Sequence, residues 1–151
     1  MKILTIEDTA SNTLSINTIL ESIQEIKNST EDCQNVRNIK EFNKVINEKV
    51  FNVIILDLNL PDSSGVTVIS NSVALLQCSK FNKNTPIIVF TAVKDCMVVK
   101  EALRIGAFDY LIKGEHSTKD IAQSIRFAIA SHNSKQKVGF LKRVFKFFRR
   151  K

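Results

Sequence analysis

Charged and polar side chains follow four apolar runs of this 151-residue sequence. Asp57 comes directly after the run VIIL, and the pair Glu7 and Asp8 comes directly after ILTI. Thr91 ends the run IIVFT, and Lys113 comes directly after YLI. An isolated aspartate at such a place is usually a helix cap or a turn residue. The joint placement of these side chains at the ends of apolar runs instead favours a functional site.

These residue types suit the chemistry of a phosphoryl group. Carboxylates held together repel one another, which raises the pKa of at least one of them unless a cation joins them. Mg²⁺ takes hard oxygen ligands and commonly uses one or two carboxylates together with phosphate oxygens. A remaining carboxylate can then attack a phosphoryl group and form an acyl phosphate, while the Lys113 ammonium and the Thr91 hydroxyl each neutralise or hydrogen-bond one phosphoryl oxygen. The set therefore predicts a magnesium-dependent phosphate acceptor.

The elements that must position these side chains follow from the apolar patterns along the chain. Five short runs rich in β-branched residues are typical of strands, and three of them are nearly continuous apolar stretches, as in a parallel sheet buried on both faces. The five runs are KILTI, CQNVR, FNVIIL, PIIVFT and AFDYLI. Helical patterns separate them, which predicts an α/β fold: an open five-stranded parallel sheet with helices on both faces. Ligands bind outside the carboxyl ends of such strands.

Five segments have the apolar spacing of helices, two of them in EFNKVINEKV and KDCMVVKEALRIG. Gly106 predicts a C-cap for the second of these. Ser117 with Asp120 predicts a capping box that opens the last helix. The apolar positions of the other three helices are Ile16, Ile19, Ile23 and Ile26; Val66, Ile69, Val73 and Leu76; and Ile121, Ile125, Ala128 and Ile129.

The composition is typical of one globular domain. Hydrophobic residues make up 44% and charged residues 25% of the chain, and no apolar run approaches the length of a membrane span. The acidic pair at Glu7 and Asp8 comes before any signal-peptide core could form, which predicts a cytosolic protein. Cys33, Cys78 and Cys96 are odd in number and far apart, so they predict reduced thiols.

The motifs together resemble the receiver domain of two-component response regulators. The matching pieces are ILTIED, VIILDLNLPDSSG, IIVFTA and GAFDYLIKG, and the resemblance covers residues 1 to about 133. It implies the flavodoxin-like receiver fold. It also implies a signalling protein rather than an enzyme. Such a protein takes a phosphoryl group from a sensor histidine kinase or a phosphotransfer protein and then presents an altered surface, made by the fourth helix, fifth strand and fifth helix, to a downstream protein.

The resemblance assigns a role to each matching residue. Asp57 is similar to the phosphorylated aspartate, Asp8 to a direct metal ligand, and Glu7 to an acid that binds the metal through water. Asn59 would offer its backbone carbonyl to the metal.

Two residues of the resemblance would form the switch. Thr91 would move toward the phosphoryl group, and the ring of Tyr110 would turn into the space that Thr91 leaves. Phosphorylation adds about −1.5 to −2 charges, enough to bias a two-state loop.

The sequence departs from the usual receiver pattern at three places. Gly114 follows Lys113 where many receivers have a proline. The segment QCSKFNKNT is longer than usual for the family, which predicts a looser loop before the fourth strand. Val93 offers no hydrogen bond to an attacking water, which predicts a moderately long-lived phosphoryl group.

The basic character of the chain is concentrated in the segment KQKVGFLKRVFKFFRRK. Residues 135–151 hold eight of the 22 Lys and Arg and none of the 15 acids, so residues 1–134 hold 14 cations and 15 acids. On a helical projection the segment has an apolar half and a cationic half, as in an interfacial helix. The apolar half includes Phe140, Leu141, Val144, Phe145, Phe147 and Phe148, and the cationic half is Lys142, Arg143, Lys146, Arg149 and Arg150.

Three partners suit this C-terminal amphipathic helix. An anionic membrane surface would attract its cations, which would place a cytoplasmic protein at the periphery of the inner membrane. The apolar half could equally dock onto the receiver or onto a second copy in a homodimer. Nucleic acid is the least favoured partner. The sequence thus predicts a receiver domain at 1–133 and a tail at 134–151 that is too short for an output domain.

A different class of function is a magnesium-dependent phosphohydrolase in which Asp57 turns over an external substrate. No second acid follows Asp57 at a spacing suited to general acid-base work, because Asn59 stands where such phosphatases place an aspartate. A receiver-like module that is never phosphorylated is a third alternative. It is disfavoured because every chemical position is filled.

Overall fold

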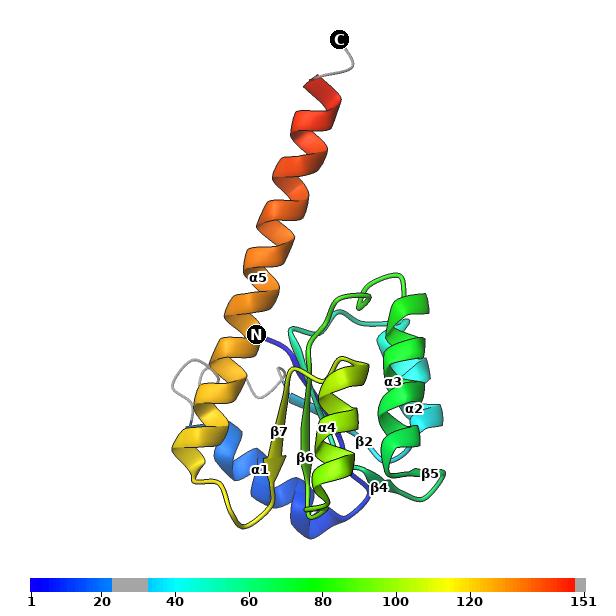
Figure 1. The fold of residues 1–151 in the computed structure, drawn as a ribbon, viewed down its shortest axis with the longest axis vertical. Helices are drawn as coiled ribbons and strands as arrows, with labels where there is room; N and C mark the ends of the chain where they lie inside the picture. The colour runs from blue at the N-terminus through cyan, green and yellow to red at the C-terminus, as the bar shows by residue number, and fades with distance from the viewer. Residues whose placement is uncertain (23–32, 149–151) are drawn as a thin grey trace.

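The computed structural model describes residues 1–22 and 33–148, and over residues 136–148 the description is of the helical backbone. The five predicted runs form one parallel five-stranded sheet in the order β2-β1-β3-β6-β7, which confirms the predicted α/β architecture (Figure 1). The strands are β1 (Ile3–Ile6), β2 (Cys33–Val36), β3 (Val53–Leu56), β6 (Ile87–Thr91) and β7 (Asp109–Ile112).

The register of the sheet brings the ends of its central strands to one level. Ile6 at the end of β1 pairs with Leu56 at the end of β3, and Thr91 at the end of β6 pairs with Ile112 of β7. The residues that follow these positions therefore emerge together at the carboxyl edge of the sheet.

Helices cover both faces of the sheet. On one face lie α1 (Ala10–Ser22) and α5 (Thr118–Phe148), and on the other lie α2 (Ile39–Ile46), α3 (Val66–Cys78) and α4 (Cys96–Ile105) (Figure 1). The predicted apolar positions Ile23 and Ile26 lie outside the described residues.

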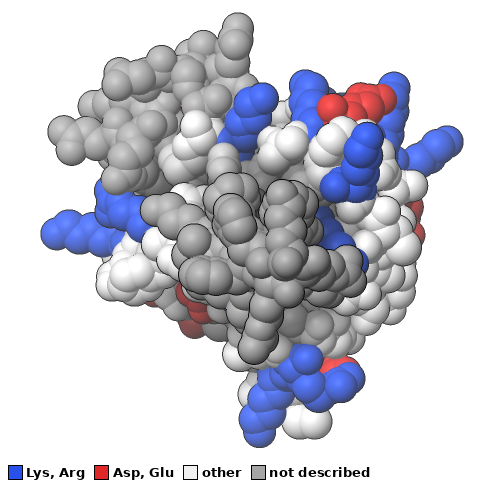
Figure 2. Space-filling view, turned by 90° about the horizontal axis from the view of Figure 1, so that it is seen from above, with Lys and Arg blue, Asp and Glu red and all other residues white. Residues whose placement is uncertain are grey.

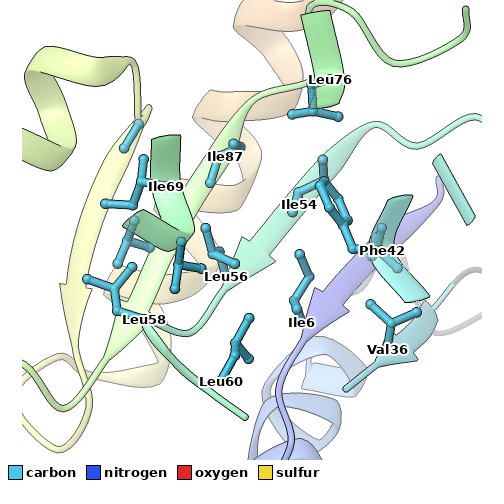
Figure 3. Close-up of a cluster of buried hydrophobic side chains, with 14 of the residues drawn as sticks. Ile6, Val36, Phe42, Ile54, Leu56, Leu58, Leu60, Ile69, Leu76 and Ile87 are labelled. Carbon is cyan, nitrogen blue, oxygen red and sulfur yellow. The ribbon is translucent and has the colours of Figure 1, made fainter. Parts of the chain in front are cut away.

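Each face has its own apolar core. Under α1 and α5, side chains such as Ile55, Ile88 and Ile125 are buried together. Under α2, α3 and α4, the cluster includes Phe42, Leu56 and Ile69 (Figure 3). Burying one large aliphatic or aromatic side chain contributes about 1.5–3 kcal/mol. These two cores therefore hold the strands in the register that sets the carboxyl edge.

The predicted helix ends are confirmed at α4 and α5. Gly106 caps α4 with φ +126°, a backbone conformation that favours glycine. The Ser117 backbone N–H donates to Asp120 Oδ2 at 2.9 Å, and the Asp120 N–H donates back to Ser117 Oγ at 3.2 Å. In contrast, α2 ends at Ile46, earlier than the pattern in EFNKVINEKV suggests.

The loop between α3 and β6 is anchored, so the expectation of a looser loop is wrong. Ser79, Asn82 and Thr85 are buried. Asn82 Nδ2 donates to the carbonyl oxygens of Ile46 and Lys49, each at 2.7 Å. These bonds tie the loop to the α2–β3 turn, which periodicity and length alone do not reveal.

The segment after Asp57 forms a feature that the apolar pattern does not predict. Strands β4 (Asn59–Leu60) and β5 (Ser63–Ser64) pair antiparallel. The carboxylate of Asp62, at the turn between them, accepts hydrogen bonds from the backbone N–H groups of Ile39 and Lys40 at 3.1 and 3.3 Å. Asp62 thus caps α2 and holds the turn beyond Asp57 in place.

Helix α5 continues without interruption across the predicted boundary at residues 133 and 134 and projects beyond the α/β body (Figure 1). Across the described part of the chain, no helix combines the length and apolarity needed to traverse a bilayer.

Candidate functional site

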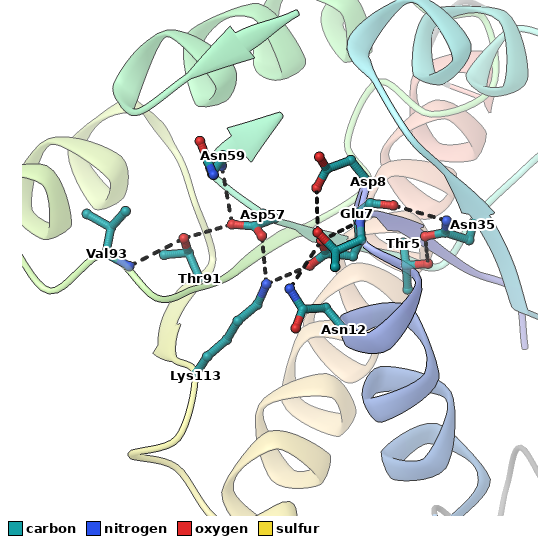
Figure 4. A network of polar contacts seen from close by, with 11 residues as sticks. Thr5, Glu7, Asp8, Asn12, Asn35, Asp57, Asn59, Thr91, Val93 and Lys113 are labelled. Carbon is teal, nitrogen blue, oxygen red and sulfur yellow. Dashed lines mark hydrogen bonds and ion pairs between the residues drawn. The ribbon is translucent and has the colours of Figure 1, made fainter. Parts of the chain in front are cut away.

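Four predicted site residues meet at the carboxyl edge (Figure 4). Lys113 Nζ lies 2.6 Å from Glu7 Oε2 and 2.6 Å from Asp57 Oδ2. The Thr91 hydroxyl donates to Asp57 Oδ1 at 2.8 Å. Residues from β1, β3, β6 and β7 are therefore in one network, as the strand-end argument predicts.

Asp57 is held on both of its carboxylate oxygens. Oδ2 accepts from Lys113, while Oδ1 accepts from Thr91 and from the backbone N–H of Asn59 at 3.2 Å. Only 6% of the residue is exposed. Its backbone N–H donates to the Ile6 carbonyl oxygen at 3.0 Å, which continues the pairing of β3 with β1, and the side-chain bonds orient the carboxylate toward the edge.

The two acids after β1 point in different directions. Glu7 is buried, and its Oε1 accepts from the backbone N–H of Thr9 at 3.0 Å and from Asn12 Nδ2 at 3.4 Å. Asp8 is exposed, and its Oδ1 accepts from the Thr9 hydroxyl at 3.1 Å. Glu7 is therefore part of the network around Lys113, whereas Asp8 lies at its solvent side.

Electrostatics at the site depend on the shared ammonium. Burial raises the pKa of Glu7, and the hydrogen bond from Lys113 only partly offsets this. Burial also opposes ionisation of Asp57, but the hydrogen bonds from Lys113 and Thr91 outweigh it and lower the pKa of Asp57. Burial would lower the pKa of Lys113, yet its bonds to both carboxylates raise it. Asp57 thus stays an anion and Lys113 a cation at neutral pH.

A chain of contacts leads from Asp57 to Tyr110. The backbone N–H of Val93 lies 3.5 Å from Thr91 Oγ1, and the Tyr110 hydroxyl donates to the Val93 carbonyl oxygen at 3.0 Å. Tyr110 is 8% exposed, so its ring is already directed inward. Burial raises the pKa of the Tyr110 hydroxyl, which keeps it protonated as a donor.

Asn35 supports the site although the sequence patterns did not identify it, and the structure explains the glycine at position 114. Asn35 of β2 accepts from the Thr5 hydroxyl at 2.7 Å and donates to the Glu7 carbonyl oxygen at 3.2 Å, which fixes the backbone just before Asp8. Gly114 has φ +82°, a conformation that proline cannot adopt. An asparagine at the end of a strand is a weak signal, but a glycine after Lys113 could have indicated such a turn.

The donor set at this edge fits a magnesium ion. Glu7, Asp8 and Asp57 with Lys113 carry a formal charge of two minus when all are ionised, which a divalent cation would neutralise. As the side chains stand, the described residues contain no cluster of three acidic, His or Cys groups arranged around a metal position, since Lys113 bridges Glu7 and Asp57.

Two cavities lie near or opposite the site. One of about 250 Å³ is lined by Lys113, His116 and Phe90 and borders the site. A larger one of about 480 Å³ lies at the amino edge, lined by Ile87, His132 and other residues that take no part in the network around Asp57. The predicted tail site from Phe140 to Arg150 lies outside the residues whose side chains are described.

The fold and the site define a doubly wound α/β domain with an acidic centre at the carboxyl edge. The chain belongs to the response regulator receiver domain family, whose model matches residues 3–126.

The relatives are longer proteins. The chain is 29% identical over 126 residues to a protein-glutamate methylesterase/protein-glutamine glutaminase of Myxococcus xanthus, and the match covers 83% of this chain and 33% of the relative. It is 31% identical over 127 residues to the transcriptional regulatory protein PhoP of Escherichia coli, covering 82% of this chain and 50% of PhoP. The chain thus spans half or less of the length of these relatives.

A solved structure shares the fold. The receiver domain of the sensor histidine kinase PA1611 from Pseudomonas aeruginosa superposes with a TM-score of 0.68 at 20% identity, covering 85% of this chain and 97% of that domain. That structure has a magnesium ion coordinated in its active-site cleft.

Proposed function

We propose that this receiver accepts a phosphoryl group on Asp57 from a phosphohistidine donor, either a sensor histidine kinase or a phosphotransfer protein. The observation that carries the proposal is the arrangement of Lys113 and Thr91 on separate oxygens of an ionised, buried Asp57. A carboxylate so placed is a nucleophile beside one cation and one hydroxyl donor, which is what phosphoryl transfer requires.

The transfer converts the carboxylate into an acyl phosphate. One Asp57 oxygen forms a bond to phosphorus while the bond from phosphorus to the donor's imidazole nitrogen breaks. The imidazole leaves as a neutral ring after taking a proton from solvent. Lys113 then neutralises one phosphoryl oxygen, and the Thr91 hydroxyl donates to another.

We propose Mg²⁺ as the cofactor, as in the related receiver domain of known structure. The carboxylates of Asp8 and Asp57 and the backbone carbonyl of Asn59 would hold it, with Glu7 acting through a water molecule. When bound, the ion supplies charge neutralisation for the phosphoryl oxygens.

The contacts from Thr91 through Val93 to Tyr110 support a switch. A phosphoryl group on Asp57 would compete for the Thr91 hydroxyl and thereby act on the segment that Tyr110 holds through the Val93 carbonyl. The surface of α4, β7 and α5 would change for a downstream protein. A long-lived phosphoryl group stays a prediction from Val93, and a lifetime of seconds would contradict it.

We further propose that residues 1–133 act as the receiver and 134–151 as a tail that binds an anionic membrane surface. The protein would then work in the cytoplasm at the periphery of the inner membrane. The eight cations of residues 135–151 support this, because each one near an anionic surface contributes about 1 kcal/mol.

Incubation with magnesium and a small acyl-phosphate donor, followed by intact-mass measurement, tests the acceptor. We expect the wild type to gain one phosphoryl group and Asp57→Asn to gain none. Asp62→Asn is the matched control, because Asp62 lies in the same loop but caps α2, and it should be labelled like the wild type. An unmodified wild type would remove the proposal, and equal labelling of Asp57→Asn would move the acceptor elsewhere.

A further inference from the structure

Helix α5 carries apolar residues on two opposite sides along its length. In its first half, Ile125, Ala128 and His132 face the sheet and are buried, whereas Phe127 and Ala130 face away. Phe127 is 59% exposed, a large value for a phenylalanine.

The second half of the helix reverses this pattern. An α-helix has 3.6 residues per turn, so residues 18 apart lie on the same side after about five turns. Phe145 therefore lies on the side of Phe127, and Phe148 lies on the side of Ala130.

The sheet-facing positions change in the opposite sense. Arg143 occupies the side of Ile125 and Lys146 the side of Ala128, although Phe140 follows the side of Ala122 and Phe147 that of Ile129. Most apolar positions of the tail thus lie on the side of α5 that is exposed in its first half, and two lie at the margin of the side that packs on the sheet.

This reversal bears on what the tail can contact. As long as α5 is one continuous helix, four apolar tail positions, Leu141, Val144, Phe145 and Phe148, lie on the side away from the chain's own sheet. The helix also projects beyond the body (Figure 1). Docking of the tail onto its own receiver would require the helix to break.

Charge separates the remaining partners. From Ile121 to Lys151 the sequence contains no Asp or Glu, and residues 135–151 carry eight cations. Two such tails packed together would repel each other, whereas an anionic lipid surface attracts them. Viewed along α5 from its C-terminal end, the described surface also shows Lys and Arg on several sides and acidic groups only in small areas (Figure 2).

We infer that the outward side of α5, from Phe127 to Phe148, is a docking surface for an anionic phospholipid membrane, so that the receiver lies on the membrane along the length of this helix. The inference rests on the membrane part of the proposed function and adds the orientation of the receiver. Asp57 follows β3 at the carboxyl edge of the sheet, whereas α5 projects beyond the body at the other end of the strands, so this orientation leaves the carboxyl edge free for a phosphoryl donor (Figure 1).

Single tryptophans report this orientation, because the chain has none. Phe127→Trp places a reporter on the docking surface. Phe81→Trp is the matched control: Phe81 is 44% exposed, lies in the α3–β6 loop and has Lys80 over its ring at 5.4 Å. This loop meets α5 at the buried His132, on the side opposite to Phe127. Full-length variants are mixed with phosphatidylcholine vesicles with or without phosphatidylglycerol.

We expect the emission of the Phe127→Trp variant to move to shorter wavelength with the anionic vesicles alone, and that of Phe81→Trp to stay unchanged. A shift of the Phe81 reporter without one at position 127 would mean that the amino edge meets the membrane end-on, and would overturn the inference. A shift at position 127 that needs no lipid and grows with protein concentration would identify a second copy as the partner, with the same consequence.

Affinity gives an independent readout. Phe127→Glu should weaken vesicle binding by about tenfold or more, since it removes an apolar contact and adds an acid. Phe81→Glu should leave binding unchanged. Wild-type protein that fails to sediment with anionic vesicles removes the membrane proposal as well, whereas wild-type binding with equal affinity for Phe127→Glu overturns only this inference. Phosphoryl labelling of Asp57 is independent of either result.

Discussion

The two edges of the sheet both bury polar side chains, but they do so with different chemistry. At the carboxyl edge, Glu7 and Asp57 are buried as carboxylates that share one ammonium. At the amino edge, Ser79, Asn82 and Thr85 are buried as neutral hydroxyl and amide groups that bond to backbone groups. The polar side chains at the two edges are buried to a similar degree, but only those at the carboxyl edge are charged.

This difference distinguishes a functional site at the carboxyl edge from a stabilising hydrogen-bond network at the amino edge. Buried charges are costly even when paired, so we expect a cluster that holds two acids to one cation to serve the chemistry of the site more than the stability of the fold. Buried neutral groups with satisfied hydrogen bonds contribute to stability, and removing one partner exposes the full desolvation cost. Substitutions at the carboxyl edge should therefore change the phosphoryl chemistry and change stability in a way that depends on pH, whereas those at the amino edge should change stability alone.

The largest effect is expected for Lys113→Met, which leaves Glu7 and Asp57 as two buried acids without a cation. Removing one partner of a buried charge pair costs about 3–5 kcal/mol. The loss should be greatest at neutral pH and shrink on acidification, as the two carboxyls become protonated. Urea unfolding at several pH values measures it.

The matched control for that variant is Lys94→Met. Lys94 pairs with Glu115, but the two side chains are 62% and 46% exposed, so the change should be at most about 1 kcal/mol. Equal losses in the two variants would show that burial does not distinguish these ion pairs.

At the amino edge, Asn82→Ala should cost about 2–3 kcal/mol. The variant removes the donors to the Ile46 and Lys49 carbonyls and the acceptor of the Phe51 N–H at 2.8 Å. Labelling of Asp57 should be unchanged, measured by intact mass at a temperature where the variant is folded. The matched control is Asn84→Ala. Asn84 lies in the same loop and is exposed, so its substitution should change the free energy of unfolding by less than about 0.5 kcal/mol. Lost labelling in folded Asn82→Ala would mean that the edges are coupled.

A smaller effect is expected for Tyr110→Phe. Tyr110 shares features of both edges, because its hydroxyl is a neutral group but is linked to the charged site. The change removes the hydrogen bond to the Val93 carbonyl and should cost about 1 kcal/mol. If this contact carries the switch, phosphorylation should alter the amide NMR signals of α4 less in the variant than in the wild type. An identical response would assign the coupling to other residues.

The carboxyl edge was far easier to predict from the sequence than the amino edge. Asp57, Thr91 and Lys113 each follow an apolar run, and parallel strands bring their carboxyl ends to one level, so pattern and topology suffice to place them together. The same patterns predict all five strands of the sheet and the caps at Gly106 and Ser117.

The apolar patterns could not predict the hydrogen bonds that single polar residues make between loops. Nothing local marks Asn82 as buried, because its partners lie more than 30 residues away in the sequence. Asn35 and Asp62 likewise bond to residues that are distant in the sequence, 28 residues away for the Glu7 carbonyl and 23 for the Ile39 N–H. The ion pairs of Lys113 with both acids also depend on the detailed rotamers, so the orientation of Asp8 away from Lys113 was not foreseeable from strand ends alone.

The smallest effect concerns Glu7, and its sign tests the comparison directly. Burial raises the pKa of Glu7, so the folded protein holds this proton at pH values where the unfolded chain, with the ordinary value of 4.5, has lost it. The contribution of Glu7 to the free energy of unfolding therefore increases as the pH falls from neutral toward 4.5. Asp57 acts in a lower window: its pKa is lowered, so its contribution is lost only as the pH falls below its ordinary value of 3.8.

Glu7→Gln removes the first of these titrations while Lys113 keeps Asp57 as a partner. Without divalent ions, we expect the variant to be more stable than the wild type at pH 7 by up to about 1 kcal/mol, and this advantage to shrink toward pH 5. Asp8→Asn, exposed beside it, is the control for removing a neighbouring acid. A variant that is less stable than the wild type at pH 7 would mean that the bond from Lys113 outweighs the burial of Glu7. The charged network of the carboxyl edge would then stabilise the fold, as the hydroxyl and amide groups of the amino edge do, in addition to forming the site.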